Sequence, residues 1–305
     1  HSADNYVVKL IEKGYKVAIC EQVEDPAEAK GIVKREITRI YTPGTLDISE
    51  AGRSENNIFI ASACVSDELT AVALADISTG ELSAYEYETE KEGKRILYER
   101  LLNDISILDV KELVISDEIA SEVELSLSEH MLNVYLDRID SSYYRYQTAR
   151  DVVMDQFGVS SLIPLDLEGR EEMTAAIGAL LMYLRDTQKG DLDQFTDVII
   201  KQHDGVMHLD RSTLRNLELL GTIYDGDIRG SLLGVIGKTR TAMGGRLLRA
   251  WLREPLTEVV EIRRRLDAVE ELRNDPIKAN NISNSLKYIY DFQRLTARAA
   301  TGRAD

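Results

Sequence analysis

Apolar and polar residues alternate over three short runs in the first third of the chain. The runs span residues 57–65, 69–78 and 81–88, and the linkers 66–68 and 79–80 are short. Alternation with a period of two is typical of strands that have one buried face. The pattern therefore predicts an antiparallel meander of three strands.

Helical and strand-like segments alternate after this meander. Helical periodicity is expected over residues 90–103, and apolar runs at 113–115 and 132–135 predict two further strands around an acidic helical piece. Two more helices are expected at Thr148 to Phe157 and at Arg170 to Gln188. This order of elements predicts an α/β fold for the middle of the chain.

Four apolar stripes with spacings of three and four follow. They consist of Leu214, Leu217 and Leu220; Met243, Leu247, Leu248, Trp251 and Leu252; Val259, Ile262, Leu266, Val269 and Leu272; and Ile282, Leu286, Ile289, Phe292 and Leu295. Such stripes predict long helices that pack side by side as a scaffold. The basic run Arg263 to Arg265 would fan around one helix, which favours solvated or salt-bridged arginines over a DNA contact.

The stretch from Gly14 to Thr45 predicts a small α/β unit. Val17 to Cys20 is an apolar run with β-branched residues, which indicates a buried strand. Asp25 to Glu28 has the signature of a helix start, with a capping aspartate and a proline at the first helical position, and Gly31 would end that turn.

Charged residues alternate with isoleucine from Lys34 to Tyr41, which predicts a second strand with one buried face. The turn Thr42 to Gly44 would end it. Lys34 and Arg35 are then available to an outer surface, where they are the candidate contacts to the phosphates of DNA.

Charge divides the chain of 305 residues into three parts. The total is −16, but residues 1–45 carry 7 basic and 7 acidic side chains, residues 46–200 carry 12 and 32, and residues 201–305 carry 18 and 14. The excess of acid thus belongs to the middle part, which would repel a phosphate backbone. We expect this part to face solvent or protein partners, with any DNA contact elsewhere.

Apolar runs are too short to cross a membrane, and no signal peptide opens the chain. Cys20 and Cys64 lie in apolar, strand-like runs, so two reduced core thiols of a cytoplasmic protein are expected rather than a disulfide or a metal site. Because the chain starts at His1 and has no closing element, it is expected to be an excised piece.

Three patterns resemble catalytic or ligand sites. Asp76, on the second predicted strand, could serve a two-metal nuclease, but converging carboxylates are lacking and a hydrogen bond into the turn at residues 79–80 is favoured. The run Gly237-Lys238-Thr239 copies the end of a P-loop, yet Leu232 stands where that motif requires glycine, so a helix-start turn is expected.

A metal site at His203, Asp204, His208 and Asp210 is not favoured, because strand-like spacing would point these side chains to opposite faces. No arrangement of nucleophile and base is visible around the histidines. We therefore expect no catalytic residue, no bound metal and no cofactor in this chain.

Several longer stretches resemble a known family. AICEQVEDPAEAKG with KREITRIYTPGT, then LDRSTLRNLELL, GSLLGVIGKTRTAMGGRLLRAWLREPL and YDFQRLTARAATGRA are similar to MutS, the bacterial DNA mismatch repair ATPase, in the family's order. The resemblance implies three parts. Residues 1–45 would be the end of the mismatch-binding domain, 46–200 a ribonuclease H-like connector, and 201–305 the first part of the helical core and lever domain.

The resemblance also implies a function for the complete protein. It would bind mispaired DNA as a homodimer and couple this binding, through ATP and Mg²⁺, to MutL in the bacterial cytoplasm, at the nucleoid. Neither the Phe-x-Glu wedge nor the ATPase domain of the family is present, so this chain is expected to be a scaffold rather than an enzyme. Asp151 and Val152 match part of the MutL-facing surface.

Two alternatives remain at this stage. One is a ribonuclease H-like metal nuclease that uses Asp76. The other is a MutS relative that acts on recombination intermediates, although such relatives typically lack the mismatch-reading domain that AICEQVEDPAEAKG represents.

Overall fold

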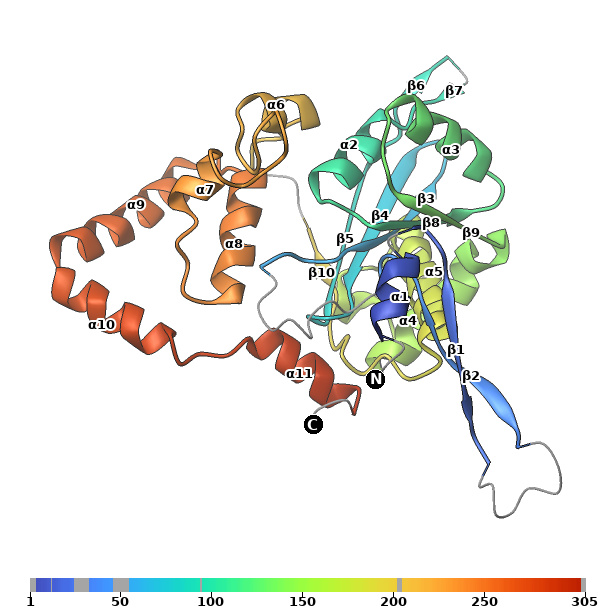
Figure 1. Ribbon diagram of the computed structural model, residues 1–305. Helices are drawn as coiled ribbons and strands as arrows, with labels where there is room; N and C mark the ends of the chain where they lie inside the picture. Colours follow the sequence, from blue (N-terminus) through green and yellow to red (C-terminus); the bar gives the residue numbers. More distant parts are fainter. Residues whose placement is uncertain are drawn as a thin grey trace.

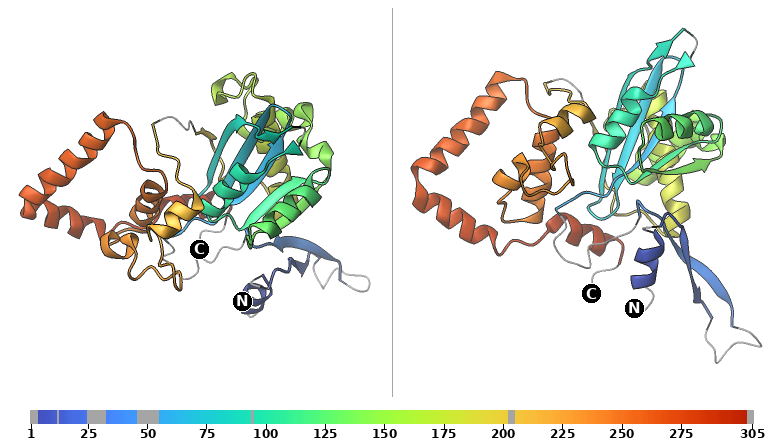
Figure 2. Two further views of the ribbon diagram at one scale, coloured as in Figure 1. Left: turned by 90° about the horizontal axis from the view of Figure 1, so that it is seen from above. Right: turned by 45° about the horizontal axis from the view of Figure 1, so that its top comes forward.

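The computed structural model describes residues 4–11, 13–24, 33–45, 55–93, 95–201 and 205–302. Three regions follow one another along the chain (Figure 1). We call residues 4–45 the hairpin region, 55–201 the sheet region and 205–302 the helical region. The helical region and the hairpin region both lie beside the sheet region, and α11 (Phe292–Ala300) comes near α1 (Asp4–Ile11), as Figure 2 shows.

A helix and a two-stranded antiparallel hairpin form the hairpin region: α1 (Asp4–Ile11), β1 (Val17–Gln22) and β2 (Arg35–Tyr41). The helix buries Val7 and Ile11 against the hairpin. The prediction of a buried strand at Val17 to Cys20 was wrong in one respect. Ala18 and Cys20 are exposed, because a lone hairpin is covered on one face only. The predicted capped turn, 25–31, lies outside the described residues.

The sheet region contains one mixed sheet of six strands in the order β10-β5-β4-β3-β8-β9. The predicted meander is confirmed, since β3 pairs antiparallel with β4 and β4 with β5, while β8, β9 and β10 add in parallel. The strands are β3 (Ile60–Val65), β4 (Leu69–Asp76), β5 (Glu81–Glu88), β8 (Glu112–Ser116), β9 (Tyr135–Ile139) and β10 (Ile199–Ile200).

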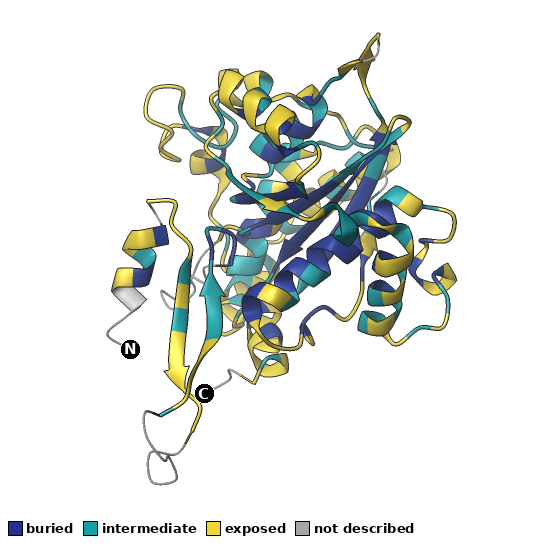
Figure 3. Ribbon diagram, turned by 90° about the vertical axis from the view of Figure 1, so that its right-hand side faces the viewer, coloured by how far each residue is buried: buried dark blue, intermediate teal, exposed yellow. Residues whose placement is uncertain are grey.

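Helices cover both faces of this sheet, and most residues of β3, β4, β5 and β8 are buried, whereas the edge strands β9 and β10 are partly exposed (Figure 3). Alternate residues of each strand face opposite layers: Ile60 packs with α4 (Tyr146–Phe157) and α5 (Glu171–Gln188), whereas Ala61 packs with α2 (Glu99–Ile107) and α3 (Ala120–Glu129). Two short 3-10 turns, Ser141–Tyr144 and Ile163–Leu165, flank α4.

Two predicted boundaries in this region were wrong. The helix expected from residue 90 starts at Glu99, and the preceding residues form a small hairpin of β6 (Lys91–Glu92) and β7 (Arg95–Ile96). The last strand of the alternation begins at Tyr135 rather than Leu132, because the chain turns through Met131 with a positive φ first.

Six helices make up the described helical region: α6 (Arg211–Asn216), α7 (Leu232–Ile236), α8 (Ala242–Arg253), α9 (Val259–Asn274), α10 (Pro276–Leu286) and α11 (Phe292–Ala300). The predicted continuous helix over 282–295 is two helices, because residues 287–291 leave the helical path and Asp291 caps the next helix. The first stripe also gives only the short α6, since Leu217 ends it.

The predicted side-by-side packing of long helices is absent from the described structure. Neither α9 nor α10 has a buried residue, and Leu266 and Val269 are more than half exposed. The helix α9 runs away from the sheet and α10 turns back toward α11, so both lie at the far side of the helical region (Figure 1). Periodicity identified the helices correctly but not a partner for their apolar faces.

Neither described cysteine forms a disulfide. Cys64 is half-buried, and burial raises the pKa of its thiol to about 12, as expected for an inert core thiol. The prediction of a core position for Cys20 was wrong, because its side chain is on the open face of the hairpin. Among the described helices, none has the length and apolar character needed to cross a membrane.

Candidate functional site

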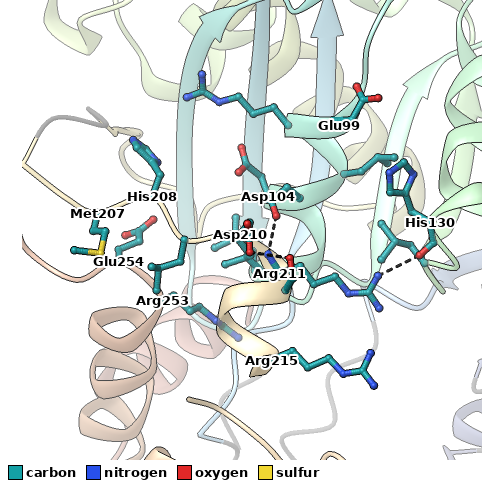
Figure 4. A pocket seen from close by; sticks show the side chains of 18 of the residues that line it. Glu99, Asp104, His130, Met207, His208, Asp210, Arg211, Arg215, Arg253 and Glu254 are labelled. Carbon is teal, nitrogen blue, oxygen red and sulfur yellow. Dashed lines mark hydrogen bonds between the residues drawn. The ribbon is translucent and has the colours of Figure 1, made fainter. Parts of the chain in front are cut away.

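A cleft of about 1270 Å³ lies between the sheet region and the helical region. One wall consists of α2, the end of β5 and the residues that follow α3. The other wall is the extended segment from Val206 to Asp210, the helix α6 and the end of α8. Figure 4 shows that charged side chains of both walls converge on this opening.

Hydrogen bonds join the two walls at Arg211. Its backbone N–H donates to Asn103 Oδ1 at 2.9 Å, and its guanidinium Nη1 donates to the carbonyl of His130 at 3.1 Å. Asp210 orients this segment, because its carboxylate accepts from the Thr213 N–H at 2.5 Å and so caps α6. The helical region is thus fastened to α2 and α3.

Buried charges lie behind the opening. Burial raises the pKa of Asp104 to about 6, although the Tyr85 hydroxyl donates to it at 2.9 Å. Burial likewise lowers the pKa of the Arg253 guanidinium on the opposite wall. Charges that are partly removed from water interact more strongly with an incoming charged group than surface charges do.

Apolar side chains at the rim remain open to solvent. Met131 is 85% exposed, Met207 is 50% exposed and Ile223 is 47% exposed. Methionine adapts its shape to irregular apolar surfaces. Among the described residues, no group of three His, Cys, Asp or Glu side chains is placed so that it could hold a metal ion.

The two predicted DNA-contacting residues lie far from this cleft, on the hairpin (Figure 1). Arg35 opens β2 and is exposed. Lys34 is also exposed, and its ammonium group pairs with the Glu36 carboxylate at 2.5 Å, which raises the lysine pKa. Both cations are accessible, but Glu36 competes with a phosphate for Lys34.

The two residues predicted to face a partner lie on α4, across the sheet from the cleft. Asp151 is exposed and accepts a hydrogen bond from Gln147 at 3.3 Å. Val152 is half-buried and packs against the core. The structure therefore does not bring this pair together with the cleft, and only Asp151 offers its side chain freely.

Asp76 is fully buried and its carboxylate is already satisfied. One oxygen accepts from Ser78 N–H at 2.9 Å and Ser78 Oγ at 2.7 Å, and the other accepts from Asn57 Nδ2 at 3.0 Å. The Asp76 carbonyl accepts from the Gly80 N–H at 3.0 Å, so the predicted turn contact exists through the backbone. The nuclease alternative gains no support.

The P-loop-like run is a linker between two helices. Gly237 ends α7, and Thr241 rather than Thr239 caps α8 by accepting from the Gly244 N–H at 3.0 Å. His203 and Asp204 lie outside the described residues. In the basic run, Arg264 pairs with Glu261 at 3.6 Å, as the salt-bridged interpretation expects, whereas the Arg265 guanidinium lies 3.7 Å from the centroid of the Trp251 ring.

The sequence did not indicate the cleft. Asn103 and Arg211 meet across 108 positions, and an asparagine in a helix or an arginine after a cap has no signal of its own. Spatial convergence, rather than a motif, creates the site.

Comparison with known proteins shows which protein family the chain matches. Family models described as MutS domain I, MutS domain II and MutS domain III match residues 1–50, 58–196 and 212–305. Proteins named DNA mismatch repair protein MutS are similar to it along its whole length. That of Desulforamulus reducens is 41% identical over 306 residues, and that of Alkaliphilus oremlandii is 39% identical over 307 residues.

Both alignments cover 100% of this chain and 34% of the relative. The protein of Caldanaerobacter subterraneus subsp. tengcongensis is 37% identical over 98% of this chain. The chain thus spans about a third of the length of the curated relatives it matches. It belongs to the MutS family, whose domains I, II and III it matches in that order.

Proposed function

We propose that this chain is the part of a mismatch repair protein that connects DNA reading to the helical core. The complete protein would bind mispaired DNA as a homodimer, use ATP and Mg²⁺, and signal to MutL at the bacterial nucleoid. The observation that carries this proposal is the ordered match of three MutS domains to one chain. The acidic middle part and the accessible cations of the hairpin support it.

ATP is not assigned to this chain. The described residues contain no P-loop, because Gly237 ends a helix and Leu232 occupies the position of the required glycine. ATP and its Mg²⁺ would bind elsewhere in the complete protein, so this chain acts as scaffold and relay.

We propose the domain division 1–45, 46–200 and 201–305, with a ribonuclease H-like connector in the middle. The support for this connector fold is the sheet order, in which three antiparallel strands are extended by two parallel ones on the β3 side. Helices on both faces agree with it. A fold of this class does not imply nuclease chemistry.

Reversing the charge of Lys34 and Arg35 tests the proposed DNA contact. In the complete protein, Lys34→Glu with Arg35→Glu should weaken duplex binding about tenfold and reduce the slope of log affinity against log salt by about 2, because two phosphate contacts are lost. The effect should be similar for matched and mismatched duplexes, since phosphate contacts carry no sequence information.

A matched control is available on the acidic region. Lys111→Glu with Arg138→Glu changes the charge equally, and these exposed side chains pair with Asp109 and Glu124. This variant should bind DNA with nearly unchanged affinity. Equal losses in both double variants would show that net charge, rather than a contact at β2, governs binding.

A partner surface at Asp151 and Val152 is proposed on α4. Asp151→Arg should weaken MutL binding to the complete protein about tenfold, because a reversed charge at an interface removes one favourable contact and adds a repulsive one. Glu124→Arg, on α3 across the sheet, is the control and should bind normally. Normal MutL binding by Asp151→Arg would refute this surface.

A further inference from the structure

Glu112 is a carboxyl group with no access to solvent at the junction of the hairpin and sheet regions. It opens β8, and its Oε2 accepts from the Gly44 N–H at 2.9 Å. A Cβ on Gly44 would lie 2.3 Å from Ile60 Cγ1, so only glycine lets the backbone approach so closely. The turn that ends β2 is therefore built onto this carboxyl.

One tyrosine hydroxyl joins Glu112 to a second carboxyl. Tyr183 Oη, on α5, contacts Glu112 Oε1 and also lies 2.6 Å from Asp137 Oδ2 on β9. A tyrosine hydroxyl has a single proton and can donate to only one of two carboxylates. The other carboxyl must therefore supply a proton of its own to the tyrosine oxygen.

The surrounding charges decide which carboxyl holds that proton. Lys16, from the hairpin region, pairs with Asp137 and stabilises its ionised form. The lysine ammonium also lies 5.5 Å from the Tyr183 ring centroid and 5.8 Å from that of Tyr135. Glu112 has no ion pair among the described residues. Burial and the neighbouring Asp137 carboxylate raise its pKa, and this outweighs the lowering effect of the hydrogen bonds from Thr42, Tyr183 and Gly44.

We propose that Glu112 carries a proton in the folded chain and donates to Tyr183, which donates to Asp137, so that one proton completes the hydrogen-bonded link between the two regions. Two groups of the hairpin region bind to this network. Lys16 forms an ion pair with Asp137, and the Gly44 N–H donates a hydrogen bond to Glu112. This network holds the hairpin region to the sheet region, and its strength depends on pH.

The pH dependence has a definite sign. The pKa of Glu112 is higher in the folded chain than in the unfolded one, so the folded state binds the extra proton. Its stabilising effect is complete below the unfolded pKa of about 4.3 and is lost as pH rises through the folded pKa. Deprotonation then sets two carboxylates against the one Tyr183 proton, and the network loosens.

Glu112→Gln is the informative variant, because a glutamine amide reproduces both roles of the neutral acid. Its oxygen accepts from the Gly44 N–H and its NH₂ group donates to Tyr183, with no proton to lose. Infrared spectroscopy of the chain near neutral pH should show a carboxylic-acid carbonyl band that is absent from Glu112→Gln. Glu122→Gln, at another tyrosine-bonded glutamate, should keep the band.

Amide hydrogen exchange provides the second measurement. After correction for intrinsic rates, protection of the Gly44 amide should fall about tenfold or more as the pH rises through the folded pKa of Glu112 in the unmodified chain. It should stay constant in Glu112→Gln and be low at every pH in Tyr183→Phe, which removes the bridge.

A band that persists in Glu112→Gln would overturn the proposal. So would exchange at Gly44 that depends equally on pH in the unmodified chain and in this variant.

Discussion

Arg246→Met is expected to lower the free energy of unfolding of the helical region by about 3 kcal/mol, because it removes the two-pronged partner of the largely buried Asp291 carboxylate and leaves only the longer contact with Arg294, at 3.8 Å. Arg246 is 6% exposed. Its two terminal nitrogens donate to both oxygens of Asp291 at 2.7 and 2.8 Å, and one of them also donates to Gln293 Oε1 at 2.6 Å. This is the strongest type of side-chain pair in proteins.

Fluorescence of Trp251 during urea denaturation measures this loss selectively. The chain has one tryptophan, which lies on α8 five residues after Arg246 and under the Arg265 guanidinium. Arg264→Met is the control, because Arg264 is 80% exposed in its pair with Glu261 and should change stability by less than about 0.5 kcal/mol. An equally small effect of Arg246→Met would contradict the assignment.

A compensating variant distinguishes the ion pair from simple packing. Arg246→Met combined with Asp291→Asn removes both charges, while the asparagine oxygen can still accept from the Arg294 N–H and cap α11. We therefore expect the double variant to be more stable than Arg246→Met alone. If it is less stable, the methylene packing of Arg246 matters more than its charge.

The pair matters beyond local stability, since it sets the position of α11. Asp291 caps this helix, and Arg294 on its first turn donates to the Asn56 carbonyl at 2.9 Å, just before the sheet begins. The helical region is thus attached to the sheet region at two places, at α11 and across the cleft at Arg211. A change at either attachment can alter the relation between the regions.

The central sheet was predictable because its signals are local. The alternation of apolar and polar residues over 57–88 predicted three strands, and the short linkers between them predicted antiparallel pairing, which the structure shows. The parallel strands β8 and β9 were foreseen as strands, but their position beside β3 depends on crossovers that leave no mark in the sequence. The family resemblance, rather than periodicity, supplied the expected architecture.

The charged sites were not predictable for a different reason. Tyr183 contacts Glu112 across 71 positions, and Arg246 contacts Asp291 across 45. Each of these residues is ordinary in its own segment: a glutamate at a strand start or an arginine on a helix usually faces water. They become strongly interacting pairs only when the fold buries both partners side by side.

On α9 and α10, in contrast, the sequence predicted buried apolar faces that the structure leaves exposed. Leu266 and Val269 follow the spacing of a buried face, yet both are exposed among the described residues. Periodicity indicates that a helix has an apolar face, but it does not indicate which element packs against that face. The side-by-side packing expected from sequence was therefore an inference about a partner that local spacing cannot specify.

Gly178→Ala is expected to destabilise the sheet region by about 1–3 kcal/mol, although alanine is normally the better helix former by about 1 kcal/mol. Gly178 lies in the middle of α5, where α4 crosses it. A Cβ there would lie 2.5 Å from both Cα and Cβ of Ala149 and 2.9 Å from its carbonyl oxygen. Because these are backbone or backbone-proximal atoms, the two helices must separate.

Denaturation followed by far-ultraviolet circular dichroism should show this loss, whereas the Trp251 transition should change little because that residue is in the helical region. Gly190→Ala is a matched control, since its new Cβ would have only Gln188 O, at 3.9 Å, within contact distance. It should alter stability by less than about 0.5 kcal/mol. A Gly178→Ala variant more stable than the unmodified chain would mean that helix propensity outweighs the close contact, and that α4, with Asp151 on it, is free to shift against α5.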